Sequence, residues 1–133
     1  MQLTNFLRDI REDYVELDRI YMPMKELEIH GLSHQDIISY CDVAHSHPMT
    51  RKDRQERRPY MKMMIIKCRE MYKHSLIGLQ YLQPEGRKAV ELAAVLYESI
   101  LDKIEKNDYD VFTLSARTTL RDKFITLYNY HRK

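Results

Sequence analysis

The residues of this chain whose types and spacing best suit chemistry lie in its first segment. At about 100° of rotation per residue, a helix places Asn5, Asp9 and Asp13 along a single ridge. Gln2 and Glu12 fall on the same side of that helix. Amide and carboxylate oxygens are the ligands that hard cations such as Mg²⁺ take, and these cations are often shared with substrate phosphates. The segment therefore offers a strip of oxygens suited to Mg²⁺.

The opposite side of the same segment is apolar, which would let a packed core hold the strip rigidly. Its residues are Leu3, Phe6, Leu7 and Ile10. Acidic residues spaced four apart on a helix are more often a solvated face than a metal site. Spacing alone therefore leaves both interpretations open.

Helices must position these residues, because the chain offers few turns to a many-stranded sheet. Its 133 residues include three Gly and four Pro, with 44% hydrophobic and 32% charged residues. This composition predicts one all-α domain and argues against disorder. No apolar run approaches the ~20 residues of a membrane span. Cys41 and Cys68 are too few for a disulfide framework, so we expect core thiols and a reducing, cytoplasmic setting.

Apolar periodicity and capping signals place the helices. We expect them over residues 2–16, 34–45, about 51–81, 84–106 and 117–131, with a helical turn after Pro23. Ser33 is the expected N-cap of the second helix. Pro59 either begins or kinks the third. The fourth is apolar on two sides, so we expect it to be central in the packing.

The net charge of +2 hides an asymmetry along the chain. Residues 1–30 carry four basic and seven acidic side chains, whereas residues 51–74 carry nine basic and three acidic ones. Such a basic block could meet phosphate, nucleic acid or an anionic membrane. More often it is the solvated face of a long helix, and we favour that interpretation. We therefore expect no nucleic-acid partner, although an anion or nucleic-acid binder stays a third, weaker hypothesis.

The opening segment also carries a family resemblance. It rests on Gln2-Leu3-Thr4-Asn5, Arg8-Asp9, Glu12-Asp13 and Arg19-Ile20-Tyr21-Met22-Pro23. Together these resemble the second aspartate-rich motif of squalene/phytoene synthases and the loop that follows it. Residues 96–102 and 109–112 resemble the penultimate helix and the following turn of the phytoene synthase branch. The resemblance runs in register over nearly the whole chain.

The resemblance implies an all-α isoprenoid-synthase fold around a deep central cleft. It implies Mg²⁺-dependent, head-to-head condensation of two prenyl diphosphates, geranylgeranyl or farnesyl diphosphate, to a linear C30 or C40 hydrocarbon in carotenoid or other isoprenoid biosynthesis. In such enzymes Mg²⁺ bridges aspartates and diphosphate as the leaving group takes up charge. Because the product is a hydrocarbon, peripheral contact of the enzyme with a membrane is also compatible with this interpretation.

Carried over position by position, the resemblance also implies roles for particular residues. The implied metal ligands are Asn5, Asp9 and Asp13. The implied substrate contacts are Gln2, Arg8, Arg19 and Tyr21. Asp9 and Asp13 would be catalytic through the metal, and Tyr97 resembles a catalytic, cleft-facing tyrosine. Without the resemblance, Tyr97 would be assigned to the core.

The chain departs from the family pattern in its number of aspartate-rich helices. Family members have another such helix before this one, and the nearest substitute here is Glu98-x-x-x-Asp102, where we assign Asp102 to packing. Residues 1–133 thus resemble the C-terminal half of an enzyme, and we expect this chain alone to be inactive. Its exposed apolar faces would then self-associate or meet a missing N-terminal half. The alternative is a non-catalytic helical relative that acts in binding or assembly.

Two smaller points stay open. In the turn after Phe112 the family brings basic residues toward phosphate, and this chain has Leu114 and Ser115 there, with Arg117 slightly further on. His45 and His47 lie beside a proline with no partner ligands, so we assign them to a surface loop.

Overall fold

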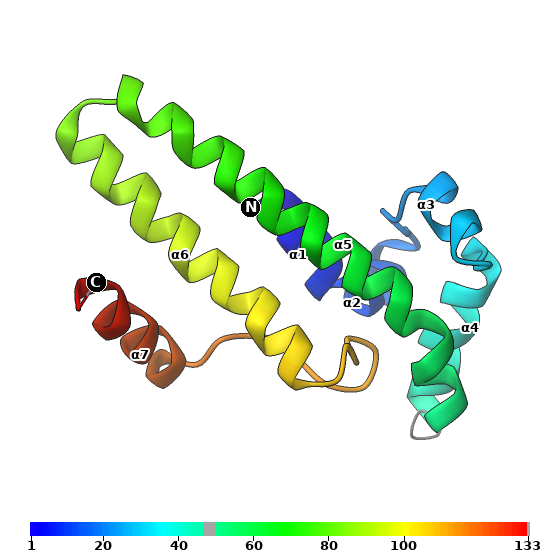
Figure 1. The fold of residues 1–133 in the computed structure, drawn as a ribbon. Helices are drawn as coiled ribbons and strands as arrows, with labels where there is room; N and C mark the ends of the chain where they lie inside the picture. Colours follow the sequence, from blue (N-terminus) through cyan, green and yellow to red (C-terminus); the bar gives the residue numbers. More distant parts are fainter. Residues whose placement is uncertain (47–49, 133) are drawn as a thin grey trace.

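The computed structural model describes residues 1–46 and 50–132, without the side chains of residues 45 and 46. Every regular element in those ranges is a helix, and no strand occurs there, as the composition predicted (Figure 1). The helices are α1 (Gln2–Arg8), α2 (Ile10–Leu17), α3 (Met24–Ile29), α4 (His34–Ser46), α5 (Arg51–Ile77), the 3₁₀ turn η1 (Gly78–Tyr81), α6 (Pro84–Lys106) and α7 (Leu120–His131).

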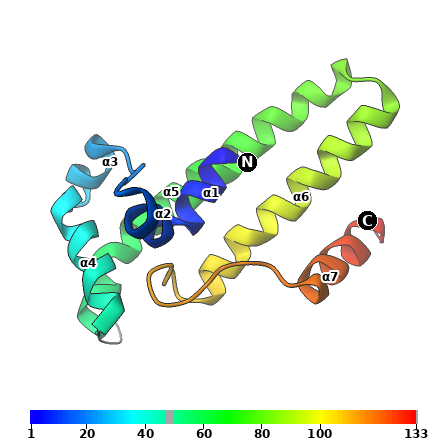
Figure 2. The same ribbon diagram turned by 180° about the vertical axis from the view of Figure 1, so that it is seen from behind.

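The long helices α5 and α6 form an antiparallel hairpin joined by η1 (Figure 1). Helix α1 contacts both of them on one side of the hairpin, and α7 packs along α6 (Figures 1 and 2). Helices α2 to α4 gather near the N-terminal end of α5. The chain's first helix is thereby held against the two longest ones.

Short polar motifs begin three of the helices. Ser33 and Asp36 cap one another, since the Asp36 amide donates to Ser33 Oγ at 3.2 Å and the Ser33 amide to Asp36 Oδ2 at 2.7 Å. This confirms Ser33 as the predicted N-cap of α4. Thr50 with Asp53, and Thr119 with Asp122, form the same capping box at α5 and α7. Pro59 lies inside α5 and does not begin it.

The core runs along one face of α5. Its members include Tyr60, Met61, Met64, Ile65, Cys68 and Tyr72, which pack with residues of α1, α2, α4 and α6. Cys41 and Cys68 are both buried and free, as expected. Burial raises the pKa of the Cys41 thiol to about 12, so this cysteine is an inert core thiol.

The structure corrects three of the predicted helix boundaries. The helix expected over residues 2–16 divides at Asp9, where φ is −103° and ψ is 16°. The helix expected over 51–81 ends as an α-helix at Ile77 and finishes as the 3₁₀ turn, and α7 begins at Leu120 and not at residue 117. At α7 the capping box of Thr119 with Asp122 sets the start of the helix.

The expectation that the helix over 84–106 is central holds only for its C-terminal half. Ala94, Ile100, Leu101 and Ile104 are buried, whereas residues 84–90 are exposed throughout. Helix α7 has no buried residue.

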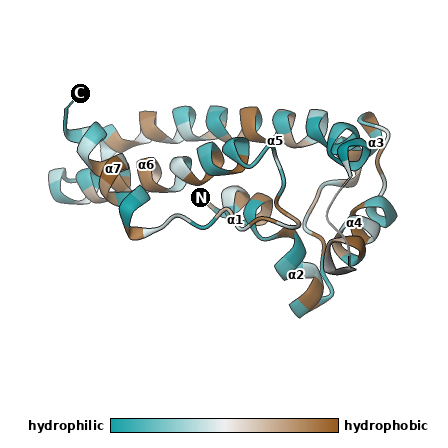
Figure 3. Cartoon of the chain, turned by 90° about the horizontal axis from the view of Figure 1, so that it is seen from below, coloured by the Kyte–Doolittle hydropathy of each residue, from teal (hydrophilic) through white to brown (hydrophobic). Residues whose placement is uncertain are grey.

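Hydrophobic and hydrophilic residues alternate along the long helices (Figure 3), and exposed apolar side chains occur, as expected. Among the described residues, no helix combines the length and apolarity needed to cross a membrane.

Candidate metal and diphosphate site

The predicted strip of oxygens exists as one continuous ridge. The Asp9 amide donates to the Asn5 carbonyl at 2.8 Å, and the Asp13 amide donates to the Asp9 carbonyl at 2.8 Å. The helical ladder therefore continues through the change of dihedral angles at Asp9. All three side chains are half-buried. The ridge bends between α1 and α2 without being interrupted.

Buried residues on the other side of α1 and α2 hold this ridge in place. Thr4 is fully buried, with its Oγ1 2.6 Å from Tyr72 Oη and 3.3 Å from Cys68 Sγ on α5. Leu7 and Ile10 enter the core, as predicted. A hydroxyl pair buried between two helices fixes their register, because separating it would leave two unsatisfied polar groups. Asn5, the next residue after Thr4, is positioned by this anchor.

Phe6 departs from the predicted apolar side. It is half-buried and lies outside the core cluster, stacked on Tyr21 with ring centroids 4.6 Å apart and an interplanar angle of 15°. Arg19 donates to Tyr21 Oη at 3.4 Å. The loop after α2 therefore folds back over α1 and brings Tyr21 onto it.

Asp9 is held by its neighbour in sequence. Arg8 Nε lies 2.6 Å from Asp9 Oδ1, and Arg8 Nη2 lies 2.5 Å from Asp9 Oδ2. This hydrogen bonding is the main reason why the pKa of the Arg8 guanidinium is raised, and the Tyr97 hydroxyl contributes electrostatically. Tyr97 of α6 is half-buried and packs against the core. The structure thus joins Arg8 to Asp9, and it places Tyr97 near enough to act on Arg8 electrostatically.

Negative charge accumulates further along the ridge. The pKa of the Asp13 carboxyl is raised, first by partial burial and then by the neighbouring charges of Asp9 and Glu12. Asn5 Oδ1 is a buried oxygen with no hydrogen-bond partner among the described residues. A cation bound at the ridge would relieve the repulsion and give Asn5 Oδ1 a partner. The donor set consists of oxygens only, which suits Mg²⁺.

A pocket of about 150 Å³ lies beside the bend. One wall consists of Arg8, Asp9, Arg11 and Glu12, and the other consists of residues 111–115, after α6. At its edge Arg117 Nη2 lies 2.6 Å from Glu12 Oε2. The turn after Phe112 lacks the family's basic residues, since it has Leu114 and Ser115 there. Arg117, two positions beyond Ser115, still brings one arginine to the acidic segment.

A buried ion pair, which sequence reasoning missed, holds that second wall. Arg57 Nη2 lies 3.5 Å from Asp110 Oδ1, and both side chains are 1% exposed. Asp110 Oδ1 also accepts the amides of Phe112 at 3.1 Å and Thr113 at 2.9 Å. The Arg57 guanidinium lies over the Phe112 ring, 4.6 Å from its centroid. The signal available in the sequence was the Asx-turn pattern that begins at Asp110.

Three further predictions concern other residues of the chain. Gln2 is exposed and lines a separate pocket of about 180 Å³ with Met71 and Tyr72, so it is not part of the wall beside Asp9. His45 and His47 fall outside the residues whose side chains are described. The basic block of α5 is largely exposed and partly ion-paired, with Arg58 3.3 Å from Asp108, which agrees with the solvated-face interpretation.

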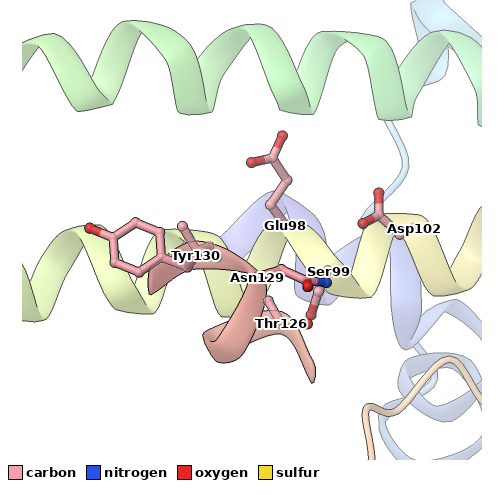
Figure 4. A pocket seen from close by; sticks show the side chains of 7 residues that line it. Glu98, Ser99, Asp102, Thr126, Asn129 and Tyr130 are labelled. Carbon is pink, nitrogen blue, oxygen red and sulfur yellow. The ribbon is translucent and has the colours of Figure 1, made fainter. Parts of the chain in front are cut away.

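A pocket of about 340 Å³ between α6 and α7 is not a second aspartate site. Figure 4 shows that Glu98 and Asp102, which line it, are directed toward α5. Asp102 lies 2.6 Å from Arg69 Nη2, and Glu105 lies 2.7 Å from the same nitrogen. Asp102 therefore supports packing, as predicted. No cluster of three or more His, Cys, Asp or Glu side chains suited to a metal occurs in the described part of the chain.

Comparison with known proteins decides the family. Residues 1–123 match the family model described as squalene/phytoene synthase. The chain belongs to this family. It is 36% identical over 126 residues to phytoene synthase 3 of Zea mays and to 15-cis-phytoene synthase of Synechocystis, covering 95% of this chain in both cases. It is 38% identical over 110 residues, 83% of its length, to phytoene synthase of Thermus thermophilus.

The match covers much less of these relatives. The chain spans 27% of the Zea mays protein, 34% of the Synechocystis protein and 34% of the Thermus thermophilus protein. No solved structure gives a significant match. The squalene/phytoene synthase family thus accounts for nearly all of this chain, and this chain accounts for about a third of a family member.

Proposed function

We propose that this chain carries one metal-binding half of the active site of a prenyltransferase of the phytoene synthase type. The complete protein would condense two prenyl diphosphates head to head, with Mg²⁺, in isoprenoid or carotenoid biosynthesis. The observation that carries the proposal is the ridge of Asn5, Asp9 and Asp13 beside a pocket that also contains arginines. Three relatives over the matched region are phytoene synthases by name.

The residues of the site would have separate roles. Asn5, Asp9 and Asp13 would hold Mg²⁺, which when bound supplies positive charge to the diphosphate leaving group. Arg8 would release Asp9 and turn to a phosphate oxygen, and Arg117 would leave Glu12 in the same way. The Tyr97 hydroxyl, which acts electrostatically on Arg8, would contact the reacting part of the substrate. Tyr21, stacked on Phe6, would help to exclude water from this wall.

Replacing Asp9 by Asn in the complete enzyme tests the proposal. Loss of the carboxylate removes its negative charge from the metal site, so Mg²⁺-dependent turnover of geranylgeranyl or farnesyl diphosphate should be abolished. Asp108→Asn is a matched control, because Asp108 pairs with Arg58 on the surface and its φ of 53° is tolerated by Asn. Unchanged turnover in the Asp9→Asn enzyme would contradict the assignment.

This chain without further polypeptide should not turn over either prenyl diphosphate. Its described residues hold one aspartate-rich ridge, and two diphosphates require more cation ligands than that ridge offers. Assay of the purified 133-residue chain, followed by hydrocarbon extraction, checks this expectation. Product formed at a measurable rate would show that one ridge is enough.

The alternative is a non-catalytic helical relative. The contact that favours it is the two-point ion pair of Asp9 with Arg8, which uses both carboxylate oxygens within the chain. Neighbouring coding sequence separates the two functions. A contiguous segment with another aspartate-rich helix supports the enzyme, whereas a stop codon in that position supports the relative.

A further inference from the structure

The pocket of about 150 Å³ beside the bend contains more arginine charge than its carboxylates neutralise. Arg8 pairs with Asp9 at 2.5 Å, and Arg117 at the edge pairs with Glu12 at 2.6 Å. Arg11 lines the same wall, and it forms no ion pair with any of the described residues. A guanidinium stays charged at physiological pH, so Arg11 leaves the pocket with a positive charge that the carboxylates of its described walls do not balance.

The Arg11 side chain also has an unused donor. It is half-buried, and its Nε is a buried atom without a hydrogen-bond partner among the described residues. Burial is the main influence on the pKa of the Cys41 thiol and raises it, and the charge of Arg11 acts in the opposite direction. The guanidinium thus lies near enough to this core thiol to act on it. A buried donor without a partner is unfavourable, which favours a ligand rich in acceptor oxygens.

The opposite wall of the pocket offers a second donor. Ser115 Oγ accepts the Arg117 amide at 3.3 Å, and the described residues supply no acceptor for the Ser115 hydroxyl proton. The hydroxyl of Thr113, on the same wall, is already used, since it donates to Asp110 Oδ2. Arg11 and Ser115 thus line the pocket from opposite walls. A guanidinium fork and a free hydroxyl are groups that bind phosphate oxygens.

We propose that Arg11, assisted by Ser115, binds a phosphate group of a diphosphate in this pocket without a divalent cation. The proposal rests on the proposed function only in taking that group to be part of a diphosphate. Arg8 and Arg117 become available to phosphate when a cation takes their carboxylates, whereas Arg11 has no carboxylate to leave. The family resemblance implies no role for Arg11. This residue therefore positions the diphosphate before the ridge takes up Mg²⁺.

Binding of inorganic pyrophosphate to the 133-residue chain in metal-free buffer tests the proposal, with the width of the pyrophosphate ³¹P resonance as the readout. We expect the unaltered chain to bind pyrophosphate. Arg11→Gln should weaken this binding about tenfold to hundredfold, because a hydrogen bond to a charged group is lost. Arg11→Lys keeps the charge without the planar fork and should lose less. Arg121→Gln is the control, since it changes net charge equally at an exposed position of α7.

Two further measurements sharpen this test. Inorganic phosphate, titrated at the same ionic strength, should bind more weakly than pyrophosphate, and equal binding would identify a site for a single phosphate group and overturn the assignment to a diphosphate. Ser115→Ala should weaken pyrophosphate binding about threefold to tenfold, because a neutral hydrogen bond is lost from the opposite wall. This variant replaces Arg11→Gln if circular dichroism shows that the latter does not fold.

The remaining outcomes overturn the proposal. Equal pyrophosphate binding by Arg11→Gln and the unaltered chain removes the role of Arg11, and an equal loss in Arg121→Gln shows attraction by overall charge. Absence of binding in metal-free buffer shows that the pocket requires a cation first. These readouts involve neither Mg²⁺ nor turnover, whereas the Asp9→Asn test of the proposed function needs both. Failure of one is therefore distinguishable from failure of the other.

Discussion

Replacing Arg8 by Met should tighten the binding of a divalent cation to the ridge when no phosphate is present. The Arg8 guanidinium bonds to both carboxylate oxygens of Asp9, at 2.6 and 2.5 Å. A cation that binds Asp9 must displace this guanidinium and then tolerate its positive charge nearby. Met keeps much of the length and the apolar stem of the side chain and removes only the charge and its hydrogen bonds.

The size of the effect follows from Coulomb's law. Two unit charges 4 Å apart interact by about 1 kcal/mol in a water-like dielectric, so a divalent ion beside a guanidinium is destabilised by about 2 kcal/mol. The two side chains are 22% and 18% exposed, which makes the local dielectric lower than that of water, whereas salt screens the repulsion. With about 1.4 kcal/mol per factor of ten, we expect affinity to rise by roughly one order of magnitude.

Mn²⁺ is a suitable probe, because its free concentration can be followed by electron paramagnetic resonance at fixed ionic strength. Arg58→Met is the control, since Arg58 pairs with Asp108 outside the pocket and its replacement changes net charge equally. Adding pyrophosphate should reverse the order, because the Arg8→Met chain would lack the proposed contact of Arg8 with phosphate. Unchanged or weaker Mn²⁺ binding by a folded Arg8→Met chain would refute the reasoning.

Three further predictions concern stability. Thr4→Val leaves Tyr72 Oη buried without its partner at 2.6 Å, and should lower the free energy of unfolding in urea by about 1–3 kcal/mol. Arg57→Met leaves the Asp110 carboxylate buried without its cation, and should destabilise the chain by about 3–5 kcal/mol, with partial recovery when Asp110→Asn is added. Asp13→Asn should raise the melting temperature at neutral pH without metal and abolish part of the Mn²⁺ affinity. Because the folded-state pKa of Asp13 is raised above 3.8, its contribution to stability is present below that pH and lost as pH rises through the raised value. The asparagine variant should therefore show a smaller loss of stability across that pH range.

The ridge and the caps could be predicted because they depend on neighbours in sequence. Asn5, Asp9 and Asp13 share a ridge at helical spacing wherever the chain is helical, and their amides and carbonyls bond as that spacing requires. Ser33 caps α4 for the same local reason, since its partner Asp36 is three residues away. The family motif then favours a metal-binding ridge over an ordinary solvated face.

The contacts that complete the site could not be predicted in this way. Residues one apart on a regular helix point about 100° away from each other, so the pair of Arg8 with Asp9 depends on the bend at Asp9. Arg57 stands in a block of basic residues and resembles its solvated neighbours in sequence. Its burial is set by Asp110, which lies 53 positions later and reaches it only through the packing of the turn against α5.

These contacts also explain how one pocket can hold opposite charges. Each of two carboxylates has an arginine of its own, with Arg8 on Asp9 and Arg117 on Glu12. A cation that takes a carboxylate frees an arginine, and a freed arginine can bind a phosphate oxygen. Cation and diphosphate binding would then be an exchange of partners in which no charge is left uncompensated. The same exchange makes the two events mutually dependent, so each ligand should raise the affinity for the other by the same factor.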